Sequence, residues 1–240
     1  MRIAVVGMGK MGHEVEAVLR ERRHEPVAVP RGEPFPAGCA VGIDFTRAEA
    51  VVDNVRSALA AGARYVVGTT GWQDKLEEVR GLVEKAGGGL VHAANFSVGV
   101  NLFYRIVRDA AALLARFPEY DPYVLERHHR QKKDAPSGTA RALAAILEGA
   151  GGKRHKAELR LDGALPEAAF HVSAVRAGGI VGEHTVGFDA GVDEILLEHR
   201  ARSRRGFASG AVLAAEWIAA RTGFHTFEDV LDDIGRTRGV

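Results

Sequence analysis

The glycine-rich stretch near the N-terminus constrains the fold of this chain more than any other feature. Gly7-Met8-Gly9-Lys10-Met11-Gly12 follows the apolar, β-branched run of residues 3–6, which is typical of a buried parallel strand. Beyond it, apolar residues recur at helical spacing to Arg23. Between a strand and a helix, GxGxxG allows a tight turn, lets a pyrophosphate approach the backbone and directs the helix N-terminus at the phosphates. The stretch predicts a dinucleotide-binding unit, with an ordinary strand-to-helix turn as the alternative.

Strand and helix patterns then alternate through the first part of the chain. Short apolar strand patterns recur at residues 26–29, 41–45, 65–67 and 90–93, with helical patterns between them. One of these helical patterns follows Thr46-Arg47-Ala48-Glu49, which has the spacing of a capping box. This rhythm predicts the α/β class, with a Rossmann-type, doubly wound parallel sheet.

Ligands of such a sheet bind at the carboxyl ends of its strands. Besides the six residues of the glycine stretch, those ends carry Phe45 and Thr46, then Gly68, Thr69 and Thr70, then Ala93, Ala94, Asn95 and Phe96. Because these segments converge at one edge of the predicted sheet, we expect them to bind a nicotinamide cofactor, NADPH and/or NADH.

The end of the second strand is the expected position of the residue that reads the cofactor ribose. An acidic residue there favours NAD, whereas an arginine favours NADP. The tip reads Pro30-Arg31-Gly32-Glu33, so the acid is displaced and Arg31 stands near its place. This favours NADPH, or the use of both cofactors, unless Arg31 is a solvated loop residue.

The second half of the chain has a different organisation. Helical patterns at residues 102–114 and 139–147 flank a strand at 123–125, and strand patterns at 170–175, 184–188 and 195–199 suggest an antiparallel meander. The apolar helix at 207–218 and a short helical tail follow. We expect two domains: a discontinuous dinucleotide-binding domain (1–97 and 208–240), and an α+β domain (98–207) with a largely antiparallel or mixed sheet. An open sheet invites pairing with another subunit.

Chemically, the most informative stretch is residues 126–140, which read Glu-Arg-His-His-Arg-Gln-Lys-Lys-Asp-Ala-Pro-Ser-Gly-Thr-Ala. His128 and His129 are adjacent, so on an extended segment they face opposite ways, and a histidine suits proton donation near neutral pH. Lys132 adds a mobile positive charge. The helix start at Ser137, Gly138 and Thr139 offers N–H groups and a hydroxyl to a carboxylate or phosphate. The residues predict an NAD(P)-linked reductase of a small anionic substrate.

Composition and charge limit the alternatives. The net charge of +1 and the lack of interleaved aromatic residues argue against a nucleic-acid partner for the basic run. The pair of histidines lacks a third ligand at a recognisable spacing, so we expect no metal. The single Cys39 excludes an intrachain disulfide, and no apolar run is long enough to cross a membrane. We expect a cytoplasmic protein without membrane or nucleic-acid partners.

Across almost its whole length, the sequence resembles the 4-hydroxy-tetrahydrodipicolinate reductase family, also called dihydrodipicolinate reductases. The His-His-x-x-x-Lys-x-Asp-Ala-Pro-Ser-Gly-Thr block is its most specific motif. The other matching segments are residues 7–12, Asp44-Phe45-Thr46, Gly68-Thr69-Thr70-Gly71, 93–101, Arg176-Ala177-Gly178, 180–185, 207–208 and 210–211.

The resemblance implies a Rossmann-type domain with a tetramerising substrate domain, and an NAD(P)H-dependent reduction in lysine biosynthesis through diaminopimelate. By the family's pattern, His128 is the proton donor and Lys132 a second catalytic donor. His129 binds the dicarboxylate substrate, and Gly138 and Thr139 hold one of its carboxylates. The resemblance also suggests a role for Arg204 without defining it.

Two departures from the family pattern concern the cofactor. Many members have one more residue in the glycine loop and an acid–Arg pair after the second strand, where this chain has Pro30-Arg31. The rival functions are a related dehydrogenase of another small acid and a nucleotide sensor without catalysis.

Overall fold

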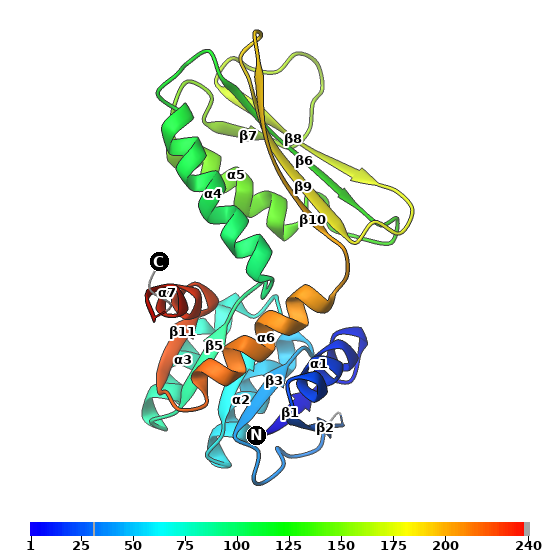
Figure 1. Cartoon of the computed structure of the whole chain (residues 1–240), viewed down its shortest axis with the longest axis vertical. Coiled ribbons are helices and arrows are strands. Elements are labelled where there is room, and N and C mark those ends of the chain that lie inside the picture. Colours follow the sequence, from blue (N-terminus) through cyan, green and yellow to red (C-terminus); the bar gives the residue numbers. More distant parts are fainter. Residues whose placement is uncertain (31, 238–240) are drawn as a thin grey trace. The chain divides into compact units, whose positions relative to one another are not determined.

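In the computed structural model, which describes residues 1–30 and 32–237, the chain forms two compact units. The first consists of Met1–Val98 and Arg204–Val240, and the second of Gly99–Ser203 (Figure 1). The chain therefore leaves the first unit once and returns to it. Arg31 lies outside the described residues.

The first unit is built on a parallel sheet with the strand order β11-β5-β4-β3-β1-β2. Its strands are β1 (Arg2–Val6), β2 (Glu25–Val29), β3 (Val41–Asp44), β4 (Arg64–Val67), β5 (Gly89–His92) and β11 (Gly223–Thr226). Its helices are α1 (Lys10–Glu21), α2 (Val51–Ala60), α3 (Leu76–Lys85), α6 (Arg205–Ile218) and α7 (Phe227–Thr237), with single 3₁₀ turns at Ala48–Ala50 and Gln73–Lys75. The expected doubly wound Rossmann-type sheet is confirmed.

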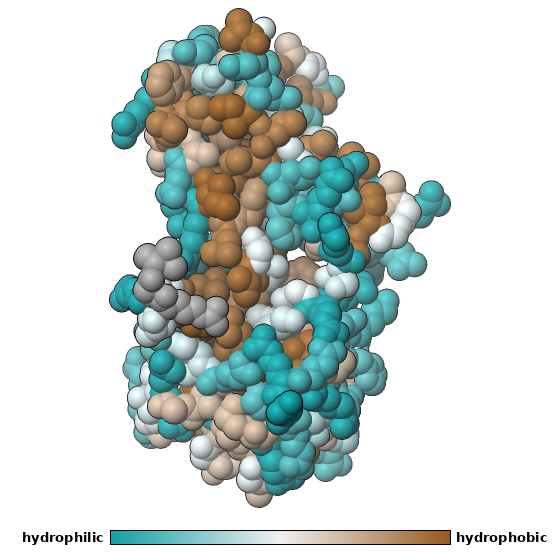
Figure 2. All heavy atoms as spheres, viewed as in Figure 1, coloured by the Kyte–Doolittle hydropathy of each residue, from teal (hydrophilic) through white to brown (hydrophobic). Residues whose placement is uncertain are grey.

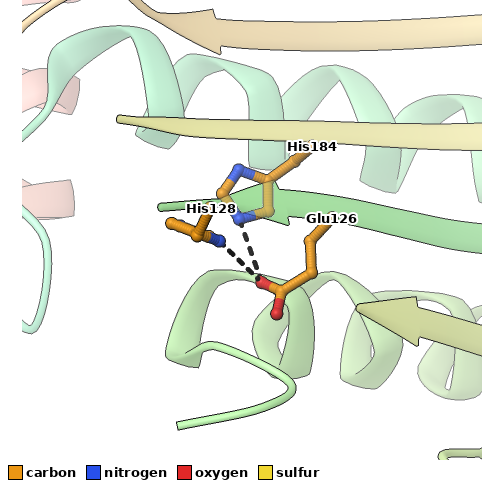
Figure 3. A group of neighbouring side chains, drawn as sticks. All are labelled: Glu126, His128 and His184. Carbon is orange, nitrogen blue, oxygen red and sulfur yellow. Dashed lines mark ion pairs between the residues drawn. The ribbon is translucent and has the colours of Figure 1, made fainter. Parts of the chain in front are cut away.

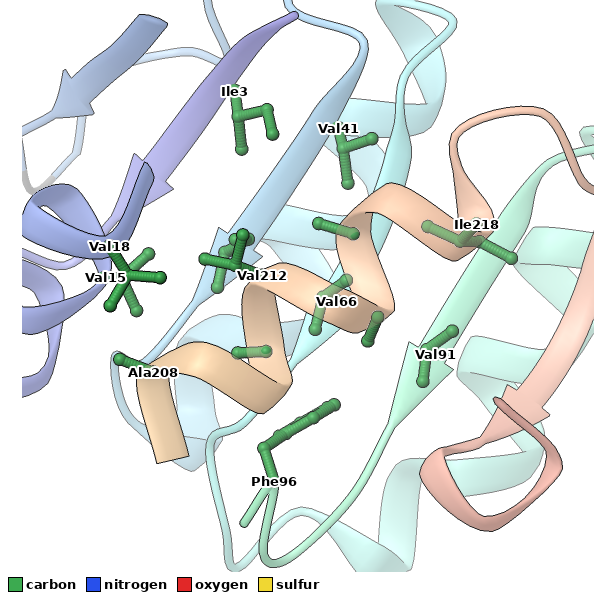
Figure 4. Packing of buried hydrophobic residues seen from close by; sticks show 14 of the residues in the cluster. Ile3, Val15, Val18, Val41, Val66, Val91, Phe96, Ala208, Val212 and Ile218 are labelled. Carbon is green, nitrogen blue, oxygen red and sulfur yellow. The ribbon is translucent and has the colours of Figure 1, made fainter. Parts of the chain in front are cut away.

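Helices cover both faces of this sheet because successive strand side chains point to opposite sides. Ile3 and Val5 pack in one core with α1, α6 and α7, whereas Ala4 and Val6 pack in the other with α2 and α3. Figure 4 shows α6 lying across the sheet, with Val212 among the strand side chains. With both faces covered, the carboxyl ends of the strands are left for ligands.

Two local expectations in this unit are wrong. The sequence predicts only a helical tail after residue 218, whereas residues 223–226 form β11, parallel to β5. A four-residue strand is too short to show a period of its own, and pairing with β5 supplies its stability. Thr46 does not open a helix: the 3₁₀ turn starts at Ala48, and the Thr46 hydroxyl donates to the buried Asp44 carboxylate instead.

The second unit is a five-stranded sheet covered on one face by two helices. Its strands lie in the order β10-β9-β6-β8-β7 and are β6 (Asp121–His128), β7 (Lys156–Glu158), β8 (Ala169–Arg176), β9 (Gly182–Asp189) and β10 (Glu194–Ala201). Its helices are α4 (Val98–Leu114) and α5 (Gly138–Ala150). Figure 1 shows both helices on the same side of the sheet.

The expected mixed sheet is confirmed, but the meander is only partly right. β9 and β10 form an antiparallel hairpin. β8 does not pair with β9, because β6 lies between them, antiparallel to β9 and parallel to β8. The segment containing α5 returns the chain parallel to β6, as a helical crossover does. This insertion places the ends of β6 and β8 beside the start of β9.

Part of the second unit's surface is apolar. Figure 2 shows hydrophobic side chains gathering over α4, where Leu102, Ile106 and Leu113 are about half exposed. Among the described residues, no helix is both long and apolar enough to span a bilayer.

Candidate active site

The centre of the candidate site in the second unit is the carboxylate of Glu126, which has no solvent exposure. Glu126 and His128 are two residues apart on β6, so their side chains leave the strand on the same face. That face is the one covered by α5. A charged group buried this completely is stable only where hydrogen bonds and opposite charges surround it.

One carboxylate oxygen, Oε1, joins Glu126 to two other elements. It accepts the Ser137 backbone N–H at 2.9 Å and the Arg176 guanidinium at 2.7 Å. Ser137 is the N-cap of α5, and Arg176 ends β8. Arg176 also donates to the Asp134 carbonyl at 2.6 Å, so the loop before α5 is held from the same side.

The other oxygen, Oε2, faces two histidine rings (Figure 3). It lies 3.4 Å from His128 Nδ1 and 3.6 Å from His184 Nε2, and the two rings meet edge to face with centroids 5.1 Å apart. These separations exceed those of ordinary hydrogen bonds. Within the described part of the chain, Glu126 Oε2 and His128 Nδ1 are both buried and have no hydrogen-bond partner of ordinary length.

These contacts keep the carboxylate ionised. Burial by itself raises the pKa of Glu126, but the contacts from His128, His184, Ser137 and Arg176 outweigh burial and hold that pKa well below its usual range. The stabilising contribution of this carboxylate is therefore present above its ordinary pKa and lost as the pH falls through the lower, folded-state value.

His184, on β9, has the opposite tendency. Burial lowers the pKa of His184, and the charges of His128 and Lys132 lower it further, against the raising effect of Glu126. The ring is therefore neutral at physiological pH. A neutral His184 donates one ring N–H and does not compete with Arg176 as the counter-charge.

The same three side chains are the group best placed to hold a metal ion among the described residues. Candidate ligand atoms of Glu126, His128 and His184 lie within 4.8 Å of one another. The Arg176 guanidinium already neutralises this carboxylate at 2.7 Å, and its positive charge opposes a second cation. The donor set therefore fits a proton-handling cluster better than a metal centre.

The predicted catalytic and substrate residues all belong to the second unit, and one of them, His128, is part of this cluster. His128 is buried at the end of β6, and His129 follows it, half buried. The Lys132 ammonium lies 2.8 Å from Asp134 Oδ1. Burial raises the pKa of Asp134, but the hydrogen bond and charge of Lys132 outweigh it and lower that pKa.

The helix start of α5 differs in part from expectation. The N–H and hydroxyl of Ser137, which the sequence predicts to contact substrate, have partners within the protein: the N–H donates to Glu126, and Oγ accepts from Ala140 N at 3.2 Å. Gly138, by contrast, is exposed, and a Cβ there would meet no protein atom within 4 Å. Gly138 and the half-buried Thr139 therefore remain the candidates for binding a carboxylate.

In the first unit, the glycine stretch has the geometry that a dinucleotide requires. Gly7 has a φ of +91°, and a Cβ on Gly12 would lie 2.2 Å from the Gly7 carbonyl oxygen. A Cβ on Gly9 would meet nothing within 4 Å, so the backbone there borders open space. The turn at Gly7, the open approach at Gly9 and the close packing at Gly12 thus occur in the order expected, with Met8, Lys10 and Met11 between the glycines.

A second buried carboxylate, Asp44, organises the neighbouring strand ends. Its Oδ1 accepts Thr46 N at 2.8 Å, Thr46 Oγ1 at 2.7 Å and Thr69 Oγ1 at 3.1 Å. Its Oδ2 accepts Asn54 Nδ2 at 2.9 Å and Tyr65 OH at 3.1 Å. Burial, followed by the charge of Asp44, raises the pKa of Tyr65 well above its ordinary value, so the phenol remains a donor.

The remaining cofactor candidates fall into two groups. Phe45 packs over Gly68, where a Cβ would lie 2.2 Å from the ring, and Thr70 is exposed. At the end of β5, Ala93, Ala94 and Asn95 are at least partly exposed. The Phe96 ring lies in the core, 4.9 Å from the Phe227 ring (Figure 4), so only its backbone is available to a ligand.

Replacing Asp44 with asparagine is expected to weaken NADH and NADPH binding about tenfold and to destabilise the fold by about 1–3 kcal/mol. The amide can accept from only one side, so donors that hold the Thr46 and Thr69 loops lose their partner. Fluorescence titration with cofactor and urea unfolding measure the two effects, with the exposed Asp53→Asn as the control. Unchanged affinity would show that these loops do not bind the cofactor.

The sequence offers no assigned role for Glu126, Arg176, His184 or Asp44. The only local signal is the spacing of Glu126 and His128, which places two titratable groups on one strand face. The other partners come from β8 and β9, and their approach depends on strand order.

Comparisons with known proteins identify the family of the chain. The family described as dihydrodipicolinate reductase, N-terminus, matches residues 32–96, and the one described as dihydrodipicolinate reductase, C-terminus, matches residues 99–231. The 4-hydroxy-tetrahydrodipicolinate reductase of Christiangramia forsetii is 35% identical over 98% of this chain and 99% of its own length. The enzyme of that name from Methanoregula boonei is 43% identical over 79% of this chain and 73% of its own length.

A solved structure shares the fold. The dipicolinate-bound dihydrodipicolinate reductase from Paenisporosarcina sp. TG-14 superposes with a TM-score of 0.73 at 24% identity, covering 95% of this chain and 98% of that one. The fold, the two matched family regions and a relative matched over nearly its whole length lead to one conclusion: the chain belongs to the dihydrodipicolinate reductase family.

Proposed function

We infer that the chain uses a nicotinamide cofactor to reduce the dehydrated form of 4-hydroxy-tetrahydrodipicolinate to tetrahydrodipicolinate, in the diaminopimelate route to lysine. The observation that carries this inference is the 35% identity, over 98% of the chain, to a relative named as this reductase. We place the reaction in the cytoplasm, because the single Cys39 fits a reducing compartment.

In the proposed mechanism, the first unit binds the cofactor and the second binds the substrate. The substrate is a dicarboxylate, for which Gly138, Thr139, His129 and Lys132 provide N–H groups and positive charge. The relative from Paenisporosarcina carries dipicolinate, a dicarboxylate of similar shape. Donors aimed at charge that redistributes during the reaction contribute more to the rate than to ground-state binding.

We assign the protonation of the reduced substrate to His128 and Lys132. Hydride addition to the conjugated imine gives an enamine, which needs a proton at a neighbouring position. Histidine is the side chain most often used as a proton donor in enzymes. His128 is placed for this role because its Nδ1 faces the ionised Glu126, and Lys132 lies in the loop that follows.

The cofactor, when bound, supplies the hydride, and the glycine stretch would hold its pyrophosphate. Three features support this: the turn at Gly7, the close packing at Gly12 and the open approach at Gly9. The loops tied to Asp44 would line the adjoining part of the site.

Turnover with the correct substrate tests the function directly. The product of dihydrodipicolinate synthase should cause oxidation of NADH or NADPH, followed as loss of absorbance. A related dehydrogenase of another acid would show no turnover with it. A nucleotide sensor would bind the cofactor and consume none, so either result would overturn the assignment.

Cofactor choice is tested by Arg31→Ala. If Arg31 binds the 2′-phosphate, the substitution should lower kcat/KM for NADPH about tenfold or more, the value of a charge-assisted hydrogen bond, and leave that for NADH unchanged. Arg56→Ala, on the surface of α2, is the control. An unchanged ratio of the two kcat/KM values means that Arg31 does not read the phosphate.

We further propose that the chain forms a homotetramer through the sheet of its second unit. Among the described residues, helices pack against one face of that sheet, and the edge strand β10 presents Leu196, 53% exposed, on the other face. Glu198 and Arg200 follow Leu196 at every second position and lie on the same face. A second copy of the chain can therefore bind both an apolar side chain and charges of either sign there.

Leu196→Glu should therefore reduce the mass measured by light scattering from that of four chains to a smaller species. A buried carboxylate without a partner opposes association. Val192→Glu, at the 91%-exposed tip of the hairpin, is the matched control and should keep the tetramer. A monomeric unsubstituted protein would contradict the proposal.

A further inference from the structure

We propose that Glu126 is a positioning residue that keeps a proton on His128 Nδ1, so that the protonated ring releases its second proton from Nε2 and is left as the neutral Nδ1–H tautomer. The inference rests on His128 being the proton donor, as proposed above. It adds which ring nitrogen acts and which residue decides this.

Glu126 Oε2 and His128 Nδ1 face each other and differ in the hydrogen bonds that they can form. An ionised carboxylate only accepts hydrogen bonds, whereas each nitrogen of a neutral imidazole either donates or accepts. Glu126 Oε2 lies 3.4 Å from His128 Nδ1, and both atoms are buried. A lone pair on Nδ1 would face the negative charge in a buried site, where charges interact more strongly than in bulk water. The proton of the neutral ring is therefore held on Nδ1, although free imidazole side chains favour Nε2.

Arg176 and Ser137 hold the Glu126 carboxylate in its ionised form and in its position. Arg176 and the Ser137 N–H occupy Oε1 at 2.7 and 2.9 Å, so the charge stays on Glu126 and Oε2 is turned towards the histidines. Other charged groups near this cluster are Lys132 and Asp134, which pair with each other at 2.8 Å.

His184 completes the arrangement from β9. Its Nε2 lies 3.6 Å from Glu126 Oε2 and 3.3 Å from Ser137 Oγ, so its proton belongs on Nε2. The edge-to-face packing of the two rings restricts the rotation of His128. His128 is thus held by a charge on one side and a ring on another.

On the side of the ring away from Glu126, His128 packs beside Gly182. A Cβ at Gly182 would lie 3.0 Å from His128 Nε2 and 3.4 Å from Cδ2. A side chain at position 182 would crowd Nε2, and glycine avoids this. The geometry thus places Nδ1 against the carboxylate and Nε2 on the other side of the ring, beside Gly182.

The tautomer can be read directly on the full chain. Two-dimensional ¹H–¹⁵N NMR of histidine side chains distinguishes the protonated nitrogen of a neutral ring, and the His128 signals are identified by their absence in His128→Gln. We expect the proton on Nδ1 of neutral His128 in the unsubstituted protein. A proton on Nε2 would overturn the inference, and this measurement does not require a folded Glu126 variant.

Kinetics provide the second test, through a double-mutant cycle at saturating substrate. Glu126→Gln should lower kcat about tenfold to a hundredfold, less than complete loss of the proton donor. In a His128→Gln background the same substitution should change kcat by less than about twofold, because residues that act as a unit are not additive. Glu148→Gln, on the exposed side of α5, is the matched control.

The outcomes separate the two proposals. If the effects of Glu126→Gln and His128→Gln multiply, Glu126 acts independently of His128 and the positioning role is wrong. If His128→Gln alone leaves kcat unchanged, the proton-donor role itself fails, whatever Glu126 does.

Discussion

His128→Gln is expected to lower kcat by about two orders of magnitude or more, the usual contribution of a general acid. Glutamine keeps a polar side chain of similar reach on β6 but cannot release a proton near neutral pH. Because the cofactor is proposed to bind residues of the first unit and His128 belongs to the second, the dissociation constants of NADH and NADPH should stay within about twofold, the scatter expected of independent sites.

Steady-state kinetics and fluorescence titration measure these two effects on the same preparation. His155→Gln, just before β7 in the second unit, is the control for a histidine outside the cluster. Loss of cofactor binding together with turnover would show that residues 126–140 are misassigned. Full activity would exclude His128 as the proton donor.

Lys132→Ala is expected to lower kcat by a similar factor, about a hundredfold or more, if Lys132 is the second donor. Its side chain is 23% exposed and its ammonium is paired with Asp134, so the positive charge is held at a defined place in the loop. Alanine removes both the charge and the proton, and KM for the dicarboxylate should rise as well.

Lys132→Arg separates those two roles. Arginine keeps the positive charge for binding a carboxylate, but its guanidinium does not give up a proton in proteins. A donor role predicts low kcat with KM near that of the unsubstituted enzyme, whereas a purely electrostatic role predicts recovery of both. The adjacent Lys133→Ala, exposed in the same loop, should behave like the unsubstituted enzyme. Equal losses in both lysine variants would point to the loop's fold.

Much of the first unit could be predicted from the sequence because its signals are local. The run before Gly7 is apolar and continuous, as a strand covered on both faces must be, and helical spacing follows it directly. The four-residue β11 could not be predicted, since it depends on pairing with β5. The capping box predicted at Thr46 is absent from the structure, because the Thr46 hydroxyl donates its hydrogen bond to the buried Asp44 carboxylate.

The second unit was harder to predict, for a reason of strand order. The hairpin of β9 and β10 is a neighbour contact and was foreseeable. The pairing of β6 with β8 joins segments separated by α5, and it displaces β8 from β9. Strand patterns show which residues alternate but not which strands are adjacent.

By itself, the sequence determined the doubly wound sheet, the glycine turn and the candidate chemistry of His128 and Lys132, since these depend on residue type and spacing along the chain. Only the tertiary structure decided what surrounds His128. Glu126 is brought to it by the strand period, whereas Arg176 and His184 arrive from β8 and β9 on either side of β6. Ser137 likewise turns its N–H inwards to that carboxylate. A buried charge must collect partners from wherever the fold supplies them, and sequence spacing does not record that requirement.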